Sequence, residues 1–240
     1  MTDKVIVLLV FLAAGVIAYL LGSINFAIIY TRAFANIDVR DVGSGNAGMT
    51  NAFRAGGKYS GILTFVCDFA KTIAAVAIGR YAVFALLNYL PQTQQIASTI
   101  DPVYGAFICG VCCLLGHLYP LYFGFRGGKG VVTSAAMVLL IDWRVFLIII
   151  AVFLICFAIS RIVSLSSIAA AVALPIATYF IYDFTHAAST YTYSPFNMGQ
   201  KNFEALFALI IAAIVIIKHR ENIKRILKGE EKKMSFKKKN

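Results

Sequence analysis

Charge is scarce in this sequence. Only 14% of its 240 residues are Asp, Glu, Lys or Arg, whereas an ordinary soluble domain carries about 25%. Acidic residues are the scarcest, because eleven Asp and Glu stand against twenty-two Lys and Arg. With 60% hydrophobic residues and a mean hydropathy of +0.80, the chain has more apolar surface than a single core of this size can bury. These values exclude a disordered or soluble globular protein and indicate a polytopic membrane protein.

The sequence also lacks a recognisable metal or disulfide framework. All five cysteines lie in apolar stretches, and Cys112 is adjacent to Cys113, a spacing that fits neither zinc ligation nor paired disulfides. We interpret them as packing residues and expect no metal and no cofactor. The uncharged run from Val5 to Thr31 has no convincing cleavage site followed by a soluble domain, so we expect this first segment to stay in the mature protein.

Hydrophobic segments predict an all-α integral membrane protein with about seven transmembrane helices. The seven are centred on Val5–Tyr30, Tyr59–Tyr89, Val103–Tyr119, Gly130–Ile141, Val145–Ser160, Ser166–Tyr182 and Phe203–Lys218. The fourth and seventh hold only 12 and 13 consecutive uncharged residues, fewer than the roughly 17 that a lone span needs. We expect these two to be tilted or shielded. The prediction is one transmembrane domain over 1–218 and a basic tail over 219–240.

Basic residues are concentrated on one side of the predicted membrane. With an odd number of spans, segments 31–58, 119–130, 161–165 and 218–240 hold 17 Lys and Arg, and the opposite side holds four. Such an excess is typical of cytoplasmic connections, so we predict an external N-terminus and a cytoplasmic C-terminus. Ten of the basic residues lie in 218–240. We interpret 228–240 as a segment held to anionic membrane lipids, and nothing in it indicates nucleic acid.

Glycine is concentrated in two of the cytoplasmic segments. Eleven of the 18 glycines lie in residues 43–61 and 116–130. The first segment reads Gly43-Ser44-Gly45-Asn46-Ala47-Gly48-Met49-Thr50-Asn51 and continues to Arg54. Glycines allow close backbone approach, successive N–H groups can form an anion nest, and Arg can hold a phosphate with two hydrogen bonds. We predict an anionic ligand here, with a flexible turn as the alternative.

The second glycine-rich segment points to the same kind of ligand. It contains Gly116-His117 and then Arg126-Gly127-Gly128-Lys129-Gly130, which leads directly into a predicted helix. Mobile backbone donors, a helix N-terminus and two cations suit phosphate, but the spacing is not that of a Walker P-loop. A simple membrane anchor is the alternative for Arg126 and Lys129. His117 is open to three readings: a base, a phosphate donor or a structural residue.

Two further polar clusters lie on the predicted cytoplasmic side. Ser164, Ser166 and Ser167 begin the sixth span, where serines are as often helix caps as ligands. His219 and Asn222 are i,i+3 neighbours and share a helix face. Asp68 and Lys71 form another i,i+3 pair inside the second span. They are either functional or a pair that neutralises itself.

Taken in chain order, these motifs resemble a known family. They are Ser44-Gly45-Asn46, Thr50-Asn51, Arg54, Gly116-His117, Pro120, Gly127-Gly128-Lys129-Gly130, Ser164-Leu165-Ser166-Ser167 and His219-Arg220-x-Asn222. The set resembles the bacterial acyl-phosphate:glycerol-3-phosphate acyltransferases, the PlsY family, over nearly the whole chain. Ala47 and Met49 stand where that pattern has Pro and Ala, a departure that affects loop stiffness more than chemistry.

The resemblance implies a seven-helix enzyme of the bacterial cytoplasmic (inner or cell) membrane, with 1–218 as a single catalytic domain and 219–240 as a cytoplasmic tail. It would move an acyl group from acyl phosphate to the 1-hydroxyl of glycerol 3-phosphate, giving lysophosphatidic acid and phosphate in the first step of phospholipid synthesis. Neither a metal nor acyl-CoA would be needed, and a monomer is compatible with this scheme. The expected catalytic residues are Ser44, Arg54, Lys129, His219 and Asn222. The expected substrate-binding residues are Gly43, Gly45, Asn46, Gly48, Thr50, Asn51, His117, Arg126, Gly127, Gly128, Gly130, Ser164, Ser166 and Ser167.

The residues themselves leave other functions open. A transporter of a phosphorylated or anionic solute would need repeated halves and polar groups at mid-membrane, and the sequence shows no repeat and few internal polar groups. A membrane scaffold would not explain clustered glycines and cations. An acyltransferase using an activated mixed anhydride needs only aligned substrates and a stabilised oxyanion. That requirement agrees with the lack of a Ser–His–Asp pattern.

Overall fold

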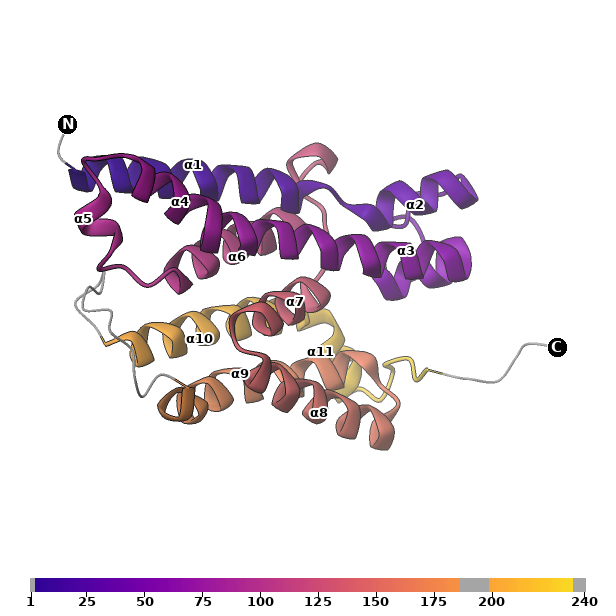
Figure 1. Cartoon of the computed structure of the whole chain (residues 1–240). Coiled ribbons are helices and arrows are strands. Elements are labelled where there is room, and N and C mark those ends of the chain that lie inside the picture. The colour runs from indigo at the N-terminus through magenta and orange to yellow at the C-terminus, as the bar shows by residue number, and fades with distance from the viewer. Residues whose placement is uncertain (1–2, 186–198, 235–240) are drawn as a thin grey trace. The chain divides into compact units, whose positions relative to one another are not determined.

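The computed structural model describes residues 3–185 and 199–234. Throughout these residues all regular structure is helical, as predicted (Figure 1). Six stretches are long and apolar enough to cross a membrane: Asp3–Ala35, Met49–Tyr89, Val103–Phe123, Trp143–Ser160, Val163–Tyr182 and Gln200–Lys218. The apolar helix Val131–Ile141, which corresponds to the fourth predicted span, has only 11 residues. The fold class is therefore confirmed, and the count of seven spans stays a prediction.

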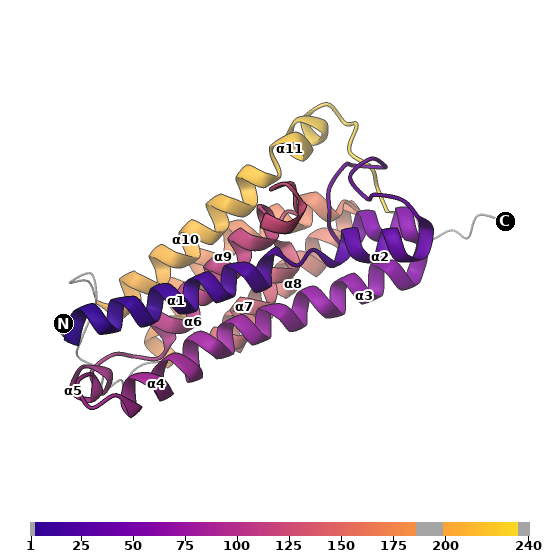
Figure 2. The ribbon, with the colours of Figure 1, turned by 90° about the horizontal axis from the view of Figure 1, so that it is seen from above.

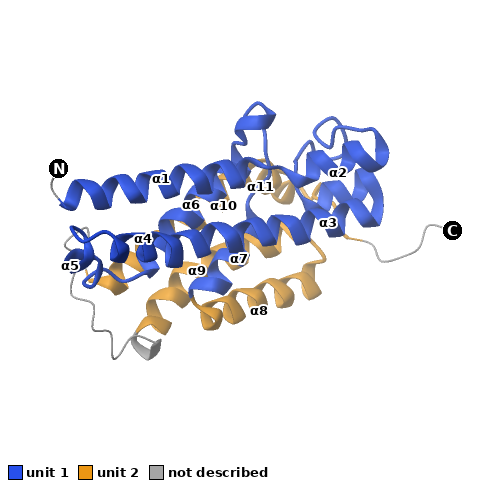
Figure 3. Ribbon diagram, turned by 45° about the horizontal axis from the view of Figure 1, so that its top comes forward, with its two compact units in different colours: residues 1–141, 190–193 blue, residues 142–189, 194–240 orange. Residues whose placement is uncertain are grey.

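The described helices form two compact units (Figure 3). Unit 1 contains the described residues up to Ile141, and unit 2 contains those from Asp142 onward. Each unit carries two of the four polar clusters recognised in the sequence. The prediction of a single catalytic domain over 1–218 stays a prediction.

Unit 1 is built from three long helical stretches and two short helices. Its elements are α1 (Asp3–Ser23), α2 (Phe26–Ala35), α3 (Met49–Ala77), the π-helical η1 (Ile78–Ala82), α4 (Val83–Tyr89), α5 (Gln94–Ala97), α6 (Val103–Leu118), the 3₁₀ turn η2 (Leu121–Phe123) and α7 (Val131–Ile141). α3 runs alongside α2, and α1 packs against α6 (Figures 1 and 2). The connection from α2 to α3 and the connection from α6 to α7 lie at the same end of the unit, where Arg40 Nη1 donates to the Phe123 carbonyl at 2.6 Å.

Two of these helical stretches are interrupted. The side chain of Asn25 accepts a hydrogen bond from Ile28 N at 3.1 Å, which caps α2 and separates it from α1. The first predicted span, Val5–Tyr30, is therefore two helices. In α3, Gly57 has a φ of 79°, a left-handed conformation that glycine adopts without steric cost. The chain kinks there, so Met49–Gly56 forms a short helical segment ahead of the long one.

At the other end of unit 1, two helices approach backbone to backbone. A Cβ atom on Gly79 would collide with the carbonyl of Gly105, and a Cβ atom on Gly105 would collide with the carbonyl of Gly79. Only glycine permits this contact between η1 and α6. Arg80 Nη1 donates to the carbonyl of Leu140 at 3.0 Å, near the end of α7, which satisfies one of the carbonyls left open at a helix C-terminus.

Unit 2 contains α8 (Trp143–Ser160), α9 (Val163–Thr185), α10 (Gln200–Lys218) and α11 (Arg220–Leu227). The carboxylate of Asp142 accepts a hydrogen bond from Arg144 N at 2.8 Å and caps α8. Arg161, with a φ of 58°, ends α8 and turns the chain into α9. α9 packs against both α8 and α10. Residues 186–198 and the part of the predicted tail beyond residue 234 lie outside the described residues.

Candidate active site

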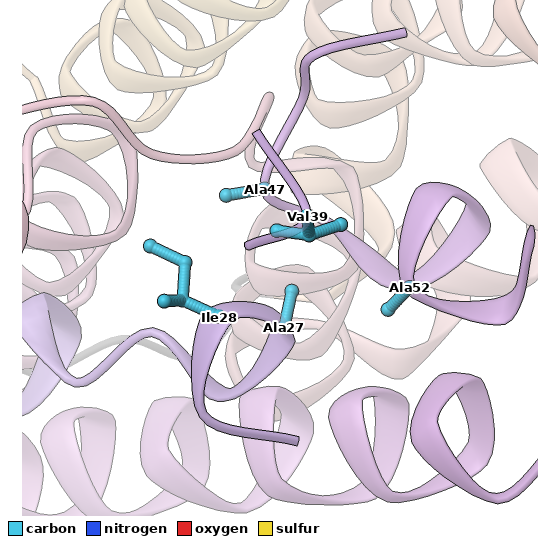
Figure 4. Packing of buried hydrophobic residues seen from close by; sticks show 5 residues of the cluster. All are labelled: Ala27, Ile28, Val39, Ala47 and Ala52. Carbon is cyan, nitrogen blue, oxygen red and sulfur yellow. The ribbon is translucent and has the colours of Figure 1, made fainter. Parts of the chain in front are cut away.

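The two glycine-rich segments meet within unit 1. A Cβ atom on Gly128 would lie 2.9 Å from the carbonyl oxygen of Ala47, so the two backbones are nearly in contact. Phe123 packs against a cluster of buried apolar side chains that joins α2, the 36–48 connection and the start of α3 (Figure 4). The cluster consists of Ala27, Ile28, Val39, Ala47 and Ala52. The structure thus brings together two segments that the sequence predicted only to share a membrane face.

The connection between α2 and α3 is held by two polar anchors. Asp38 accepts hydrogen bonds from Arg32 at 2.7 Å and from Arg40 at 2.8 and 2.9 Å. The bond from Arg40, the largest effect, holds the pKa of the Asp38 carboxyl well below its usual range. Asn51 donates to the carbonyls of Val39 and Val42 at 2.7 and 2.9 Å.

The side-chain oxygen of Asn51 accepts a third bond, from Ser44 N at 3.2 Å. The buried Asn51 amide is therefore engaged in building the loop rather than directed to solvent. Ser44 itself is exposed and stands between Gly43 and Gly45, whose φ values are 64° and 67°. This geometry presents the Ser44 hydroxyl at the surface of a fixed loop.

The end of the first motif is helical rather than a loop. Gly48 is the N-cap of α3, so Thr50, Asn51 and Arg54 lie on its first turns. Arg54 is exposed and precedes the kink at Gly57, and no hydrogen bond or ion pair within the described residues engages its guanidinium. Asn46, Gly48 and Thr50 are half-buried. Among the polar side chains of this motif, those of Ser44 and Arg54 are the exposed ones.

The second motif forms a tight loop that ends at the start of α7. Gly128 N donates to the carbonyl of His117 at 3.1 Å, and Gly130, with a φ of 79°, packs against Leu114. α7 begins at the next residue, Val131, so the free N–H groups of a helix N-terminus follow the loop directly. Lys129 is half-buried in this loop, and Arg126 is exposed at its beginning.

His117 lies behind this loop and is buried. Its Nδ1 atom is 3.2 Å from Lys71 Nζ, and a Cβ atom on Gly128 would collide with its Nε2 atom. These contacts support the structural reading among the three that the sequence left open. They join the charged pair of α3 to the glycine-rich loop.

Unit 2 gathers its polar residues around an acidic side chain that the sequence analysis missed. Glu231 accepts hydrogen bonds from Ser164 Oγ at 2.7 Å, from Asn222 Nδ2 at 2.6 Å and from Arg225 Nε at 2.7 Å. Burial alone would raise the pKa of Glu231, but these three hydrogen bonds outweigh it and hold the pKa below its usual value. An acidic residue within an otherwise basic tail was the available signal.

The other predicted residues of unit 2 bond mainly to the backbone. Ser166 and Ser167 donate to the carbonyls of Ile162 and Val163, each at 2.9 Å. His219 is buried at the junction of α10 and α11, and its Nδ1 atom lies 2.7 Å from the carbonyl oxygen of Val215. In unit 2 the structure therefore brings Ser164 and Asn222 together, because both side chains bond to Glu231.

The described residues contain no group of three or more His, Cys, Asp or Glu arranged to hold a metal ion. The five cysteines carry free thiols. What the site offers is cations, hydroxyls, amides and backbone N–H groups, a donor set suited to phosphate.

Comparison with known proteins identifies the family. The sequence profile described as "Glycerol-3-phosphate acyltransferase" matches residues 12–229. The glycerol-3-phosphate acyltransferase of Chlorobaculum tepidum is 38% identical over 97% of this chain and 100% of its own length. The enzyme of Clostridioides difficile is 35% identical over 95% of this chain and 97% of its own.

Solved structures agree with the sequence relatives. The crystal structure of PlsY, an integral membrane glycerol 3-phosphate acyltransferase, in its glycerol 3-phosphate form has a TM-score of 0.70 and 33% identity, covering 94% of this chain and 96% of that one. The lysophosphatidic acid form of PlsY gives 0.68 and 32%, covering 94% and 95%. From the profile, the full-length relatives and the shared helical fold, this chain belongs to the glycerol-3-phosphate acyltransferase family of integral membrane proteins.

Proposed function

We propose that this membrane acyltransferase uses acyl phosphate as its donor and the 1-hydroxyl of glycerol 3-phosphate as its acceptor. The observation that carries the proposal is the meeting of the two glycine-rich segments in unit 1, which contain Ser44, Arg54 and Lys129. Both proposed substrates carry a phosphate and one carries a long apolar chain. A site at the membrane surface with cations and N–H donors suits both phosphates, while the bilayer-facing helices suit the chain, at about 0.8 kcal/mol per buried methylene.

Arg54 and Lys129 are proposed to hold the substrate phosphates. Arg54 can bind a phosphate with two parallel hydrogen bonds, and its exposure leaves it available for this. Lys129 supplies a point charge next to the N-terminus of α7, where backbone N–H groups add to the attraction for an anion. Ser44 adds a hydroxyl donor, and the remaining glycines of both motifs let a phosphate approach the backbone closely.

The proposed reaction is a direct transfer. The 1-hydroxyl oxygen of glycerol 3-phosphate attacks the acyl carbon, the new C–O ester bond forms, and the bond from the acyl carbon to the phosphate oxygen breaks. The hydroxyl proton passes to a phosphate oxygen of the substrate, and phosphate leaves. The protein aligns the two substrates and stabilises the negative charge that develops on the acyl oxygen. No acyl-enzyme is needed, which agrees with the lack of a base beside Ser44 in the described contacts.

One assay tests the donor and the acceptor together. Purified protein in detergent is incubated with acyl phosphate and glycerol 3-phosphate, and the lipid product is identified by mass spectrometry. We expect lysophosphatidic acid and one equivalent of phosphate, with no product from acyl-CoA. Product from acyl-CoA alone would contradict the proposed donor. No product from either donor, with glycerol 3-phosphate counterflow in vesicles, would favour a transporter.

The form of the kinetics tests the mechanism. We expect initial-rate patterns that require both substrates to be bound together, and activity that survives chelators and replacement of all five cysteines by Ala or Ser. A ping-pong pattern, or an acyl group trapped on Ser44, Ser164 or a cysteine, would contradict direct transfer.

A further inference from the structure

A charged pair is buried in the middle of α3. The side chains of Asp68 and Lys71 are 3% and 4% exposed, and Oδ1 of Asp68 lies 2.7 Å from Nζ of Lys71. Burying two charges inside a membrane protein is costly even when they neutralise each other. Residues of this kind therefore call for a role beyond packing.

The hydrogen bonds of Lys71 define that role. Its Nζ atom donates to the carbonyls of Gly22 and Ile24 at 3.0 and 2.7 Å and is hydrogen-bonded to Nδ1 of His117 at 3.2 Å, whereas its contact with the Asp68 carboxylate is an ion pair. An ammonium group has three protons, and these two carbonyl oxygens and the ring nitrogen can accept all of them. Lys71 therefore has no donor left for a substrate, and its charge is committed to the protein.

The acceptors are well matched to a buried cation. Gly22 is in the last turn of α1, and Ile24 lies in the break between α1 and α2. Carbonyls at a helix C-terminus lack intrahelical partners and carry partial negative charge. Lys71 thus fastens the end of α1 to the middle of α3.

Lys71 is linked to the glycine-rich loop through its hydrogen bond with His117. Its Nζ atom is 3.2 Å from Nδ1 of His117, in the last turn of α6. The carbonyl of His117 accepts the hydrogen bond from Gly128 N, and there is no room for a side chain between the His117 ring and Gly128. The position of His117 consequently sets the position of the loop that carries Lys129.

We propose that Lys71 is a positioning residue, which, with Asp68, holds His117 so that the Gly127–Gly130 loop is preformed for the phosphate of a substrate. The inference rests on the proposed function in one respect, namely that this loop binds a phosphate of glycerol 3-phosphate or of acyl phosphate. A preformed loop contributes equally to ground-state and transition-state binding, so its loss raises KM and leaves kcat nearly unchanged.

The first test removes the pair while keeping the site neutral. Replacing one member alone strands a buried charge, so the variant is Lys71→Met combined with Asp68→Asn. We expect the KM for at least one substrate to rise about tenfold, with kcat within about threefold of the wild type. If the double variant does not fold, the same KM and kcat measurement is made on Lys71→Arg, which keeps the charge of the pair.

Arg80→Met is the matched control. Arg80 lies in η1, directly after α3, and like Lys71 it donates to a backbone carbonyl, that of Leu140, but at the opposite end of unit 1. Its loss is expected to lower the melting temperature in detergent while leaving both KM values unchanged. If Arg80→Met and the Lys71 variants change KM alike, the effect is general destabilisation and the proposal is wrong.

A double-mutant cycle tests whether Lys71 acts through His117. The single variants are Lys71→Met with Asp68→Asn, and His117→Gln. If the path runs through His117, the combined variant has the KM of the worse one, whereas independent effects would multiply. Multiplying effects, or an unchanged KM in every variant, would overturn the proposal.

A binding measurement separates this inference from the proposed function. Isothermal titration of glycerol 3-phosphate and of inorganic phosphate into the wild type and the variants needs no acyl donor. Weaker binding in the Lys71 variants supports the positioning role even if acyl phosphate turns out not to be the donor. Equal binding of both probes to wild type and variants, in a wild type that is active with acyl phosphate, overturns the positioning role alone.

Discussion

The hydroxyl of Ser164 donates a 2.7 Å hydrogen bond to the carboxylate of Glu231, 67 residues further along the chain. The same carboxylate oxygen accepts a bond from Asn222 at 2.6 Å, and Met234 N donates to the carbonyl of Arg161. The segment after α11 is thereby fastened to the start of α9. Ser164, predicted to bind substrate, and Asn222, predicted to be catalytic, are thus held in place by an acidic residue that no motif had marked.

Replacing Glu231 by Gln removes the charge that Asn222, Ser164 and Arg225 share. Hydrogen bonds to charged groups contribute about 1.5–3 kcal/mol, so we expect about a tenfold loss of kcat/KM and a lower melting temperature. Glu230→Gln is the control, because Glu230 is the exposed neighbour and takes part through its backbone N–H alone. Equal behaviour of the two variants would show that the carboxylate does not organise α11.

The same contact predicts a pH dependence of stability. The pKa of Glu231 is lowered in the folded protein, so its stabilisation is fully present above the ordinary pKa of glutamate, about 4.3, and is lost as the pH falls through the lowered value. The difference in melting temperature between wild type and Glu231→Gln should be constant near neutral pH and shrink only below about pH 4. A difference that disappears already between neutrality and mildly acidic pH would contradict the assignment.

Arg54 and Lys129 should each be needed for activity. Their replacement by Ala removes a charge-assisted contact with a phosphate, so we expect kcat/KM to fall more than about tenfold in a protein that still folds. Lys58→Ala is the control, because Lys58 is exposed on the far side of the Gly57 kink. Its effect should stay within about twofold. Near-wild-type kcat/KM in a folded Arg54→Ala or Lys129→Ala variant would show that the residue does not hold a substrate phosphate.

Asn51 should matter through the loop that it supports. In Asn51→Asp the side chain keeps its shape but loses both donors and places a carboxylate against the carbonyls of Val39 and Val42. We expect a loss of stability of about 2 kcal/mol and a large loss of activity. Asn88→Asp removes a similar bond, from Asn88 Nδ2 to the Phe84 carbonyl, and should cost stability without a specific loss of activity. A stable, active Asn51→Asp variant would show that the loop does not depend on this amide.

The predicted topology can be tested by labelling. In a variant without native cysteines, we expect Asp41→Cys and Lys228→Cys to react with an impermeant maleimide only after the cells are opened, and Gln95→Cys to react in intact cells. All three positions are exposed in the structure. Reaction of Asp41→Cys in intact cells would show that the orientation in the membrane is the opposite of the predicted one.

Much of the fold could be predicted from hydrophobic runs, because a helix needs a minimum number of consecutive apolar residues to cross a membrane. The third predicted span, Val103–Tyr119, differs from α6 by one residue. The breaks were harder to predict. Nothing in the composition around Asn25 distinguishes a helix cap from a polar residue inside a span. Gly57 is one of several glycines in its segment, and the sequence does not show that the kink of α3 falls at this one.

The candidate site was recognisable by residue type but not by contact. Clustered glycines and cations marked both loops of unit 1, yet the sequence could not show that Asn51 turns inward to hold its own loop while Ser44 and Arg54 stay exposed. Glu231 was assigned to a lipid-bound tail because its neighbours are basic. Its partners Ser164 and Asn222 become visible only when α9 and α11 are placed together.

The buried pair of α3 also bears on how the chain enters the membrane. A charged segment is inserted more easily when partners for its charges are already at hand. Asp68 and Lys71 are synthesised together, and the carbonyls of Gly22 and Ile24 precede them in the chain, whereas His117 follows. Lys71 can thus be neutralised and hydrogen-bonded as soon as α3 meets α1, before α6 has been made. In the order of synthesis, the charges therefore gain their partners first, and the loop at 127–130 gains its support from His117 afterwards.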